Sequence, residues 1–307
     1  MNERHLLGAL EMGDTRIVCA TGYEDGTIVS RCEIPATTPE KTVPQISQWF
    51  VNKGISAAGI CTYGPCVVSP ASSDFGTIIE APDASWSGFD LIGTMRTTLD
   101  VPCGLDTDVN AACLGEATYG CAQGLDDVVY VLAASGVGVG VMTGGTLLHG
   151  MLHPEAGHVP VVPDHRDPIV DDGTCSYHGT CLEGYLSQAA IEKRWGDISF
   201  DELAHDDEAM DILSGYLAQA VYTYMLCYSP RRIIIGGDLA EQTPIVELTR
   251  PKVEDLLGGL LTTPELEDMD GYLMTSQLGG DAGLKGCLTL AWRALVNRDG
   301  HVADGSL

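Results

Sequence analysis

Two histidines and two cysteines recur at short spacings in the middle of the chain, and they constrain how this region can fold. The spacing is His158-x16-Cys175-x2-His178-x2-Cys181. Imidazole nitrogens and thiolate sulfurs are ligands that Zn²⁺ prefers, and a structural zinc site closes a tetrahedron with four of them. The two short gaps let three ligands converge from one tight loop, while the long gap brings the fourth from a neighbouring segment. The alternative is a loop that carries these residues by chance; the spacing favours structural zinc.

Two carboxylates flank the predicted ligands. Glu155 lies shortly before His158, and Glu183 follows Cys181 closely. A metal ion that holds this segment would also fix both glutamates in space. We therefore expect the two carboxylates to bind a small molecule rich in hydroxyl groups.

Composition limits the class of protein. The chain has 307 residues, of which 45% are apolar, and 37 are glycines. Such a chain is typical of a globular α/β protein with two domains. Its net charge of −27, from 43 acidic and 16 basic residues, repels nucleic-acid phosphates, so we expect no nucleic-acid partner.

Cysteine usage and hydropathy indicate the compartment. The 11 cysteines are odd in number and scattered, which indicates a reducing compartment without a disulfide framework. We find no secretory signal pattern and expect a cytoplasmic location. Residues 128–154 contain no Asp, Glu, Lys or Arg, but glycines interrupt the segment. Short strands joined by turns explain it better than a membrane span, so we expect no membrane partner.

Strand and helix patterns alternate along the chain, which indicates an α/β protein with mixed sheets. We expect strands at residues 57–62, 101–104 and 128–133, a turn at 11–15, and helices at 108–119, 210–228 and 283–295. The predicted domains are an N-terminal α/β domain of residues 1–115, completed by a C-terminal helix at about 284–307, and a C-terminal α/β domain of residues 116–283 that carries the zinc loop. A polar tail follows from Asn297.

Three glycine-containing turns follow expected strands. They are Gly13-Asp14-Thr15, Ser135-Gly136-Val137-Gly138 and Gly236-Gly237-Asp238. Glycine lets backbone N–H groups approach phosphate oxygens closely. Any one such turn is a common way to connect strands, but three together favour a nucleotide site. No P-loop or Rossmann glycine pattern follows a strand.

Asp108 opens the helix expected at 108–119. An aspartate in this position is commonly only a helix N-cap. Here the helix behind it has a small, apolar face, which would pack tightly and aim the carboxylate in a fixed direction. A carboxylate so placed can accept a hydroxyl proton during phosphoryl transfer.

At these motifs the chain resembles the bacterial ROK-family fructokinases, within the actin/hexokinase/Hsp70 superfamily. The matching segments are Leu7–Gly13, Thr107–Glu116, His149–His158, the Cys-x2-His-x2-Cys loop, Ala190–Gly196 and Ile234–Gly237. The resemblance implies two actin-like, ribonuclease H-like α/β domains with an interdomain cleft. It also implies ATP-dependent phosphorylation of a hexose, with D-fructose converted to fructose 6-phosphate.

The resemblance also implies roles for individual residues. Asp108 would be the catalytic base, and Glu155 and Glu183 would bind sugar hydroxyls. Asn110 and His158 would also lie at the sugar. A structural Zn²⁺ would be held by His158, Cys175, His178 and Cys181. The nucleotide would meet Gly13, Thr15, Arg16, Ser135, Gly136, Gly236, Gly237, Gly279 and Gly280. Mg²⁺ would accompany ATP, and the protein would be a homodimer.

Departures from the family pattern lie on the nucleotide side. The first phosphate turn has Asp14 and Arg16 where the family has glycine and lysine, Val67 stands where the family has an acid, and Ala189 stands in a segment expected to contact the nucleotide. We therefore expect weak or relaxed use of the phosphate donor. The alternatives are a kinase for glucose or mannose, or a sugar-binding protein of this fold with weak or lost kinase activity. A sugar-responsive repressor would need a helix-turn-helix extension, and the acidic charge disfavours it.

Overall fold

The computed structural model describes residues 4–298, and the chain forms two compact units. Unit 1 comprises Met1–Gly124, Gly145–Pro154 and Asp281–Leu307, and unit 2 comprises Leu125–Gly144 and Glu155–Gly280. The sequence-based division into residues 1–115 with about 284–307, and 116–283, remains a prediction about domains. The polar tail beyond residue 298 lies outside the described residues.

Unit 1 contains a mixed sheet with the strand order β3-β2-β1-β4-β5. Strands β1 (Leu7–Met12), β2 (Arg16–Gly22) and β3 (Ile28–Pro35) are antiparallel neighbours, whereas β4 (Ala57–Thr62) and β5 (Cys103–Thr107) continue the sheet parallel to β1. Because β1, β4 and β5 run in the same direction, their carboxyl ends meet at one edge of the sheet. That edge carries β1's turn and the helix after β5.

Two expectations about unit 1 were wrong, and both errors come from strand pairing. The expected turn at 11–15 is shorter, because Glu11 and Met12 pair with Val18 and Ile17 of β2. The strand expected at 101–104 instead begins at Cys103 and extends to Thr107, because its whole length pairs with β4. The strand at 57–62 is confirmed.

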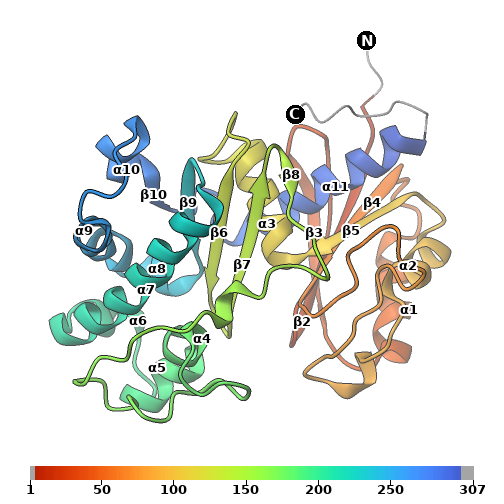
Figure 1. Ribbon diagram of the computed structural model, residues 1–307. Coiled ribbons are helices and arrows are strands. Elements are labelled where there is room, and N and C mark those ends of the chain that lie inside the picture. The colour runs from red at the N-terminus through yellow and green to blue at the C-terminus, as the bar shows by residue number, and fades with distance from the viewer. Residues whose placement is uncertain (1–3, 299–307) are drawn as a thin grey trace. The chain divides into compact units, whose positions relative to one another are not determined.

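The helices of unit 1 are α1 (Pro39–Phe50), the short η1 (Ala84–Trp86), α2 (Leu91–Leu99), α3 (Asp108–Tyr119) and α11 (Ala282–Arg298). Helix α11 packs against α3 and against strands β1, β4 and β5 (Figure 1). The packing is backbone to backbone: a Cβ atom on Gly59 would lie 1.7 Å from the Cys287 carbonyl oxygen. The close approach of α11 to β4 therefore requires glycine at this position. The predicted helix at 108–119 is confirmed.

Unit 2 has the same strand plan around a second mixed sheet, with the order β10-β9-β6-β7-β8. Strand β6 (Val128–Ala133) is antiparallel to β7 (Val137–Thr143) and parallel to β9 (Arg232–Gly236), which is parallel to β10 (Leu273–Thr275); β8 is Thr146–Leu147. In each sheet an antiparallel hairpin is followed by parallel strands. The predicted α/β class with mixed sheets is confirmed.

The longest helix of unit 2 is α7 (Asp207–Tyr228), which starts three residues before the sequence-based estimate because Asp206 caps it through the Ala209 N–H. The others are η2 (Ala156–His158), α4 (Leu182–Leu186), α5 (Gln188–Trp195), α6 (Phe200–Ala204), α8 (Asp238–Gln242), α9 (Ile245–Leu257), η3 (Pro264–Glu267), α10 (Met269–Tyr272) and η4 (Gly279–Asp281). Within residues 4–298, no helix is both long and apolar enough to cross a membrane.

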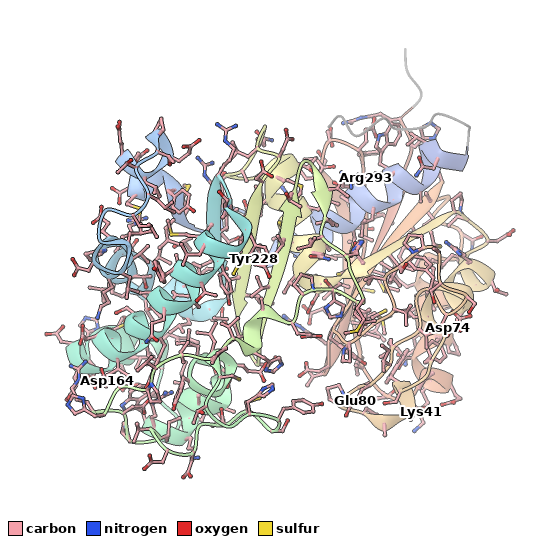
Figure 2. The ribbon with its side chains drawn as sticks, in the orientation of Figure 1. Lys41, Asp74, Glu80, Asp164, Tyr228 and Arg293 are labelled. Carbon is pink, nitrogen blue, oxygen red and sulfur yellow. The ribbon has the colours of Figure 1, made fainter. Side chains whose placement is uncertain are left out.

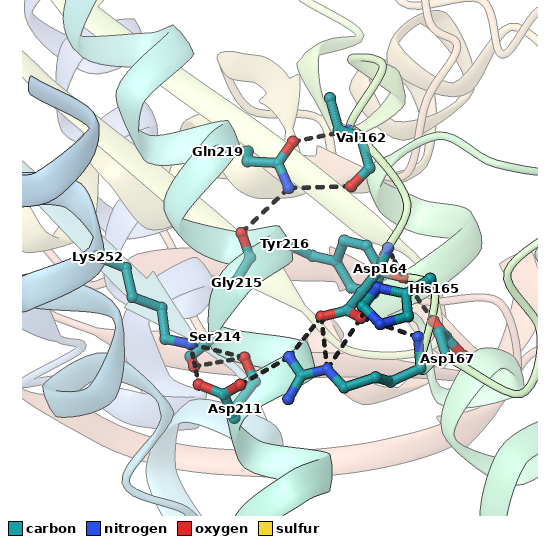
Figure 3. Close-up of polar contacts among 11 residues, drawn as sticks. Val162, Asp164, His165, Asp167, Asp211, Ser214, Gly215, Tyr216, Gln219 and Lys252 are labelled. Carbon is teal, nitrogen blue, oxygen red and sulfur yellow. Dashed lines mark hydrogen bonds and ion pairs between the residues drawn. The ribbon is translucent and has the colours of Figure 1, made fainter.

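A buried ion pair anchors the segment between η2 and α4. Asp167 accepts hydrogen bonds from the Arg194 guanidinium at 2.6 and 2.8 Å and from the Tyr216 hydroxyl at 2.7 Å. Neither Asp167 nor Arg194 exposes any of its side chain to solvent. Figure 3 shows Asp167 beside Tyr216 and the neighbouring contact in which Gln219 binds both backbone groups of Val162. The segment is thus tied to α5 and α7.

Asp167→Ala should lower the free energy of unfolding by about 3–5 kcal/mol, because it leaves a buried guanidinium without its partner. Asp172→Ala is the matched control from the same segment: Asp172 is 81% exposed, and its nearest cation, Lys193, is 3.9 Å away. The control should cost less than about 1 kcal/mol. Urea unfolding of both variants measures the difference, and equal losses would show that the buried pair does not anchor the segment.

Candidate active site and metal centre

Unit 2 brings the four predicted metal ligands together. The ligand atoms of His158, Cys175, His178 and Cys181 all lie within 4.8 Å of one another. The His158 Nδ1 atom is 3.6 Å from the Cys175 sulfur and 3.5 Å from the Cys181 sulfur. Two nitrogens and two sulfurs at this separation fit the donor set of a structural zinc ion. The predicted cluster is confirmed as a group that could hold a metal ion.

Local backbone pairing forms this arrangement. Cys175 and Gly179 exchange backbone hydrogen bonds in both directions, which closes the tight loop that the short spacings predicted. His158 ends η2, and Cys181 immediately precedes α4. The Leu182 N–H donates to the Val159 carbonyl at 3.0 Å, which joins the two ligand-bearing segments next to the cluster.

Glu183 lies beside the metal cluster in the first turn of α4. One carboxylate oxygen is 3.9 Å from His158 Nδ1, and the other accepts the backbone N–H of Val137 at 3.2 Å. Glu155 immediately precedes η2, and its carbonyl accepts the His158 N–H. Both glutamates therefore lie next to the predicted metal ligands, as the sequence predicted. Their contacts with sugar remain predictions.

The glycine turns of unit 2 follow the carboxyl ends of the parallel strands. Ser135 and Gly136 follow β6, Gly236 and Gly237 end β9, and Gly279 and Gly280 come after β10. Gly237 has φ +97°, and a Cβ atom on it would lie 2.1 Å from the Ala133 carbonyl oxygen, so this turn lies against the end of β6. Ligands of open α/β sheets bind at such an edge. Contact of these residues with a nucleotide remains a prediction.

In unit 1, the turn between β1 and β2 contains Gly13, Thr15 and Arg16. The Gly13 N–H donates to the Arg16 carbonyl at 2.9 Å and closes the turn. Asp14 accepts the Thr15 N–H at 2.8 Å, and the exposed Arg16 side chain pairs with Glu33 at 3.3 Å. The two charges that depart from the family pattern are therefore each engaged within the turn or its neighbouring strand.

Asp108 is the first residue of α3, and Thr107 is the residue that caps the helix, through the Asn110 N–H. Asp108 accepts the N–H of Val109 at 2.8 Å. The capping role that would have been the simplest explanation of Asp108 therefore belongs to Thr107. Asn110, which the resemblance placed at the sugar, is fully buried, and its amide donates to Asp106 at 2.7 Å. Its sugar contact remains a prediction.

Sequence reasoning missed a pair next to this helix, between buried Asp106 and half-buried His149. Asp106 accepts a hydrogen bond from the His149 ring at 2.9 Å, and this bond raises the pKa of His149 although burial opposes the shift. His149 stands in a segment that matches the family, which was the only available signal. The partners are far apart in sequence, so their pairing depends on the fold.

Glu11 was also missed. It belongs to β1, and burial raises the pKa of its carboxyl group to about 7; the negative charges of Asp108 and Asp281 add to the shift, and Arg16 opposes it. Two neighbouring carboxylates thus act on Glu11 at the carboxyl edge of the unit 1 sheet. An arrangement of this kind fits a divalent cation with oxygen ligands, such as Mg²⁺.

From the metal centre we predict one zinc ion per chain, and we predict that the stability of unit 2 depends on this ion. Cys181→Ser should lose the metal and lower the Tm by roughly 5–10 °C, about what a loss of 2–3 kcal/mol produces in a domain of this size. Cys227→Ser, at an exposed cysteine, is the control and should change neither quantity. Elemental analysis and calorimetry measure both; a stable, fully active protein without zinc would contradict the prediction.

Glu11 predicts a specific dependence of stability on pH. Because its pKa is higher in the folded protein than in the unfolded chain, its stabilising contribution is present below about pH 4.5 and is lost as the pH rises to about 7. Glu11→Gln stays neutral, so relative to wild type it should gain up to about 3 kcal/mol between pH 5 and pH 8.

Urea unfolding at the two pH values, without divalent cations, measures this gain. Glu80→Gln is the control, since Glu80 is an exposed carboxylate of the same unit (Figure 2), and it should show no such trend. The same stability difference between Glu11→Gln and wild type at both pH values would disprove the shift.

Comparison with known proteins is consistent with this geometry. The ROK family model matches residues 7–294. A relative from Bacillus subtilis (strain 168) is 38% identical over 291 residues, covering 94% of this chain and 96% of its own. A fructokinase of Pediococcus pentosaceus is 35% identical and covers 95% and 99%. The ROK hexokinase structure from Thermus thermophilus has a TM-score of 0.75 at 23% identity and covers 95% and 99%. By the extent of these matches, the chain belongs to the ROK family.

Proposed function

We propose that this protein is an ATP-dependent hexose kinase that converts D-fructose to fructose 6-phosphate. The observation that carries the proposal is the group of carboxylates at the carboxyl edge of the unit 1 sheet, where Asp108 begins α3 close enough to Glu11 to raise its pKa. Phosphoryl transfer needs a carboxylate to receive the hydroxyl proton and a cation to offset phosphate charge. The name of the Pediococcus pentosaceus relative, a fructokinase, supports fructose as the sugar.

Asp108 is the base in this proposal. The hydroxyl oxygen of the sugar attacks the terminal phosphorus of ATP, its proton passes to the Asp108 carboxylate, and ADP leaves. Asp108 is held in place by its bond to the Val109 N–H and by the tight contact between α3 and α11, where a Cβ atom on Gly115 would lie 2.3 Å from the Ala282 carbonyl oxygen. Mg²⁺ bound with ATP would offset the phosphate charge.

Glu11 is the residue we assign to that Mg²⁺. Its raised pKa reflects burial and the unfavourable charges of Asp108 and Asp281, and a nearby divalent cation would remove the penalty and favour the carboxylate. In unit 2, Glu155 and Glu183 would hold sugar hydroxyls, and the zinc ion would fix their segment without taking part in chemistry. The glycine turns after β6, β9 and β10 would receive the nucleotide.

One observation favours a second candidate, a sugar-binding protein with weak kinase activity. The Asp14 carboxylate accepts a hydrogen bond from the Thr15 N–H, so this backbone donor is not available to a phosphate. The carboxylate also adds negative charge to the turn. The same feature supports weak or relaxed use of the donor in an active kinase. A homodimer and a cytoplasmic location complete the proposal as expectations from the family resemblance.

A panel of fructose, mannose and glucose with MgATP, followed by ADP release, tests the function. Fructose should give the highest kcat/KM. Glucose or mannose as the best substrate would keep the kinase and change its sugar. Sugar binding by calorimetry without ADP release from any hexose would support the second candidate and refute the first.

Asp108→Asn should lower kcat by about 10²–10⁴-fold, the usual contribution of a positioned general base. Stability should hold, because Thr107 supplies the cap and asparagine keeps an oxygen for the Val109 N–H. Asp90→Asn, the same change at the N-cap of α2 in the same unit, is the control and should keep wild-type kcat. A folded Asp108→Asn protein with normal kcat would show that Asp108 is not the base.

A further inference from the structure

The Glu183 carboxylate lies between the metal cluster and the turn after β6. Its two oxygens face different partners: one is 3.9 Å from His158 Nδ1, and the other accepts the Val137 N–H at 3.2 Å. Val137 is the first residue of β7, directly after Ser135 and Gly136. One side chain therefore links a predicted zinc ligand with the turn that we expect to meet phosphates.

Gly136 lies directly against this carboxylate. Its φ does not lie in the left-handed region, so its backbone does not require glycine. A Cβ atom at this position would lie 2.8 Å from a Glu183 carboxylate oxygen, closer than Cβ atoms approach other atoms, so the carboxylate would have to shift. An added methyl group at residue 136 would therefore displace the Glu183 carboxylate from its present position.

The turn depends on the metal segment in two further ways. The Gln188 N–H, at the start of α5, donates to the Ala134 carbonyl at 2.9 Å. Gly157, inside η2, packs so closely on β7 that a Cβ atom on it would lie 1.8 Å from the Val137 carbonyl oxygen. A movement of η2 or α4 would therefore shift the backbone of residues 134–137.

We propose that Glu183 is a positioning residue that transmits metal occupancy to the turn Ser135–Gly136, so that the metal site sets the affinity for the nucleotide as well as for the sugar. A metal ion held by the four ligands fixes Cys181, the residue before α4, and thereby the first turn of α4, which carries Glu183. Glu183 in turn holds the Val137 N–H through a hydrogen bond. The inference rests on the proposed function, because it takes this turn to be the phosphate turn.

Equilibrium binding of a non-hydrolysable ATP analogue with Mg²⁺, measured by calorimetry without sugar, tests the inference. Glu183→Ala removes the acceptor of the Val137 N–H and should raise the Kd about tenfold. Glu183→Gln keeps an acceptor oxygen and should stay within about twofold of wild type. Metal content and circular dichroism of each variant establish that it is folded and loaded.

Glu155→Ala is the matched control. Both glutamates are expected at the sugar, so both alanine variants should raise the KM for fructose. Only Glu183→Ala should also raise the KM for ATP and the Kd of the analogue in the absence of sugar. A purely structural loss would weaken both glutamate variants alike, which would overturn the proposal.

Gly136→Ala approaches the same contact from the other side. Its methyl group displaces the carboxylate, so it should weaken analogue binding as Glu183→Ala does. In a Glu183→Ala background the additional loss should be small, because the displaced group is gone. A full additional loss would mean that the methyl group blocks the phosphates directly, and the coupling through Glu183 would be wrong.

Metal removal completes the test. Chelation, followed by removal of the chelator and return of Mg²⁺, should raise the Kd of the analogue in wild type about tenfold and have little further effect in Glu183→Ala, whose link is already broken. Equal analogue affinity of wild type and Glu183→Ala, in a protein that phosphorylates a hexose, would refute the inference alone. A wild-type protein that neither binds the analogue nor forms ADP would refute the proposed function as well.

Discussion

Between the end of η2 and the start of α4, residues 159–181 form no regular helix or strand, so side chains have to fix the path of the backbone. Two polar anchors do so. The cluster of His158, Cys175, His178 and Cys181 closes one end, and the buried pair of Asp167 with Arg194 holds the middle against α5 and α7. Irregular segments of this length inside compact units are usually functional. Here the two glutamates that we assign to the sugar, Glu155 and Glu183, flank the segment.

In unit 2 a buried carboxylate is paired with a cation, whereas in unit 1 several carboxylates lie near one another. In a chain with a net charge of −27, like charges are gathered at one sheet edge rather than dispersed. Glu11 shows the cost, because burial and its acidic neighbours raise its pKa. The negative charge of Asp106, by contrast, is met by hydrogen bonds from Asn110 and His149. Carboxylates whose pKa is raised by burial and by neighbouring negative charges are typical of catalytic and cation sites.

The two kinds of site differ in how they tolerate sequence change. The sugar-and-zinc segment keeps the spacing of the family, and its side chains contact one another closely. The turn after β1 carries Asp14 and Arg16. Asp14 accepts the Thr15 N–H, and Arg16 forms an ion pair with Glu33. A turn built from backbone donors can change its side chains and keep its shape, but each donor that a side chain occupies is lost to the phosphate. We therefore expect these departures to affect use of the phosphate donor rather than the fold.

The sequence by itself determined the features whose partners are close along the chain or whose pattern is periodic: the α/β class, the strands at 57–62 and 128–133, the helix at 108–119 and the ligand spacing around Cys175. It did not reveal that Glu11 belongs to a strand, because that depends on pairing with Val18 of β2. Nor did it reveal the bond from Asp106 to His149 or from Glu183 to the Val137 N–H. These contacts join residues distant in sequence, and only the packed sheets bring them within hydrogen-bonding distance.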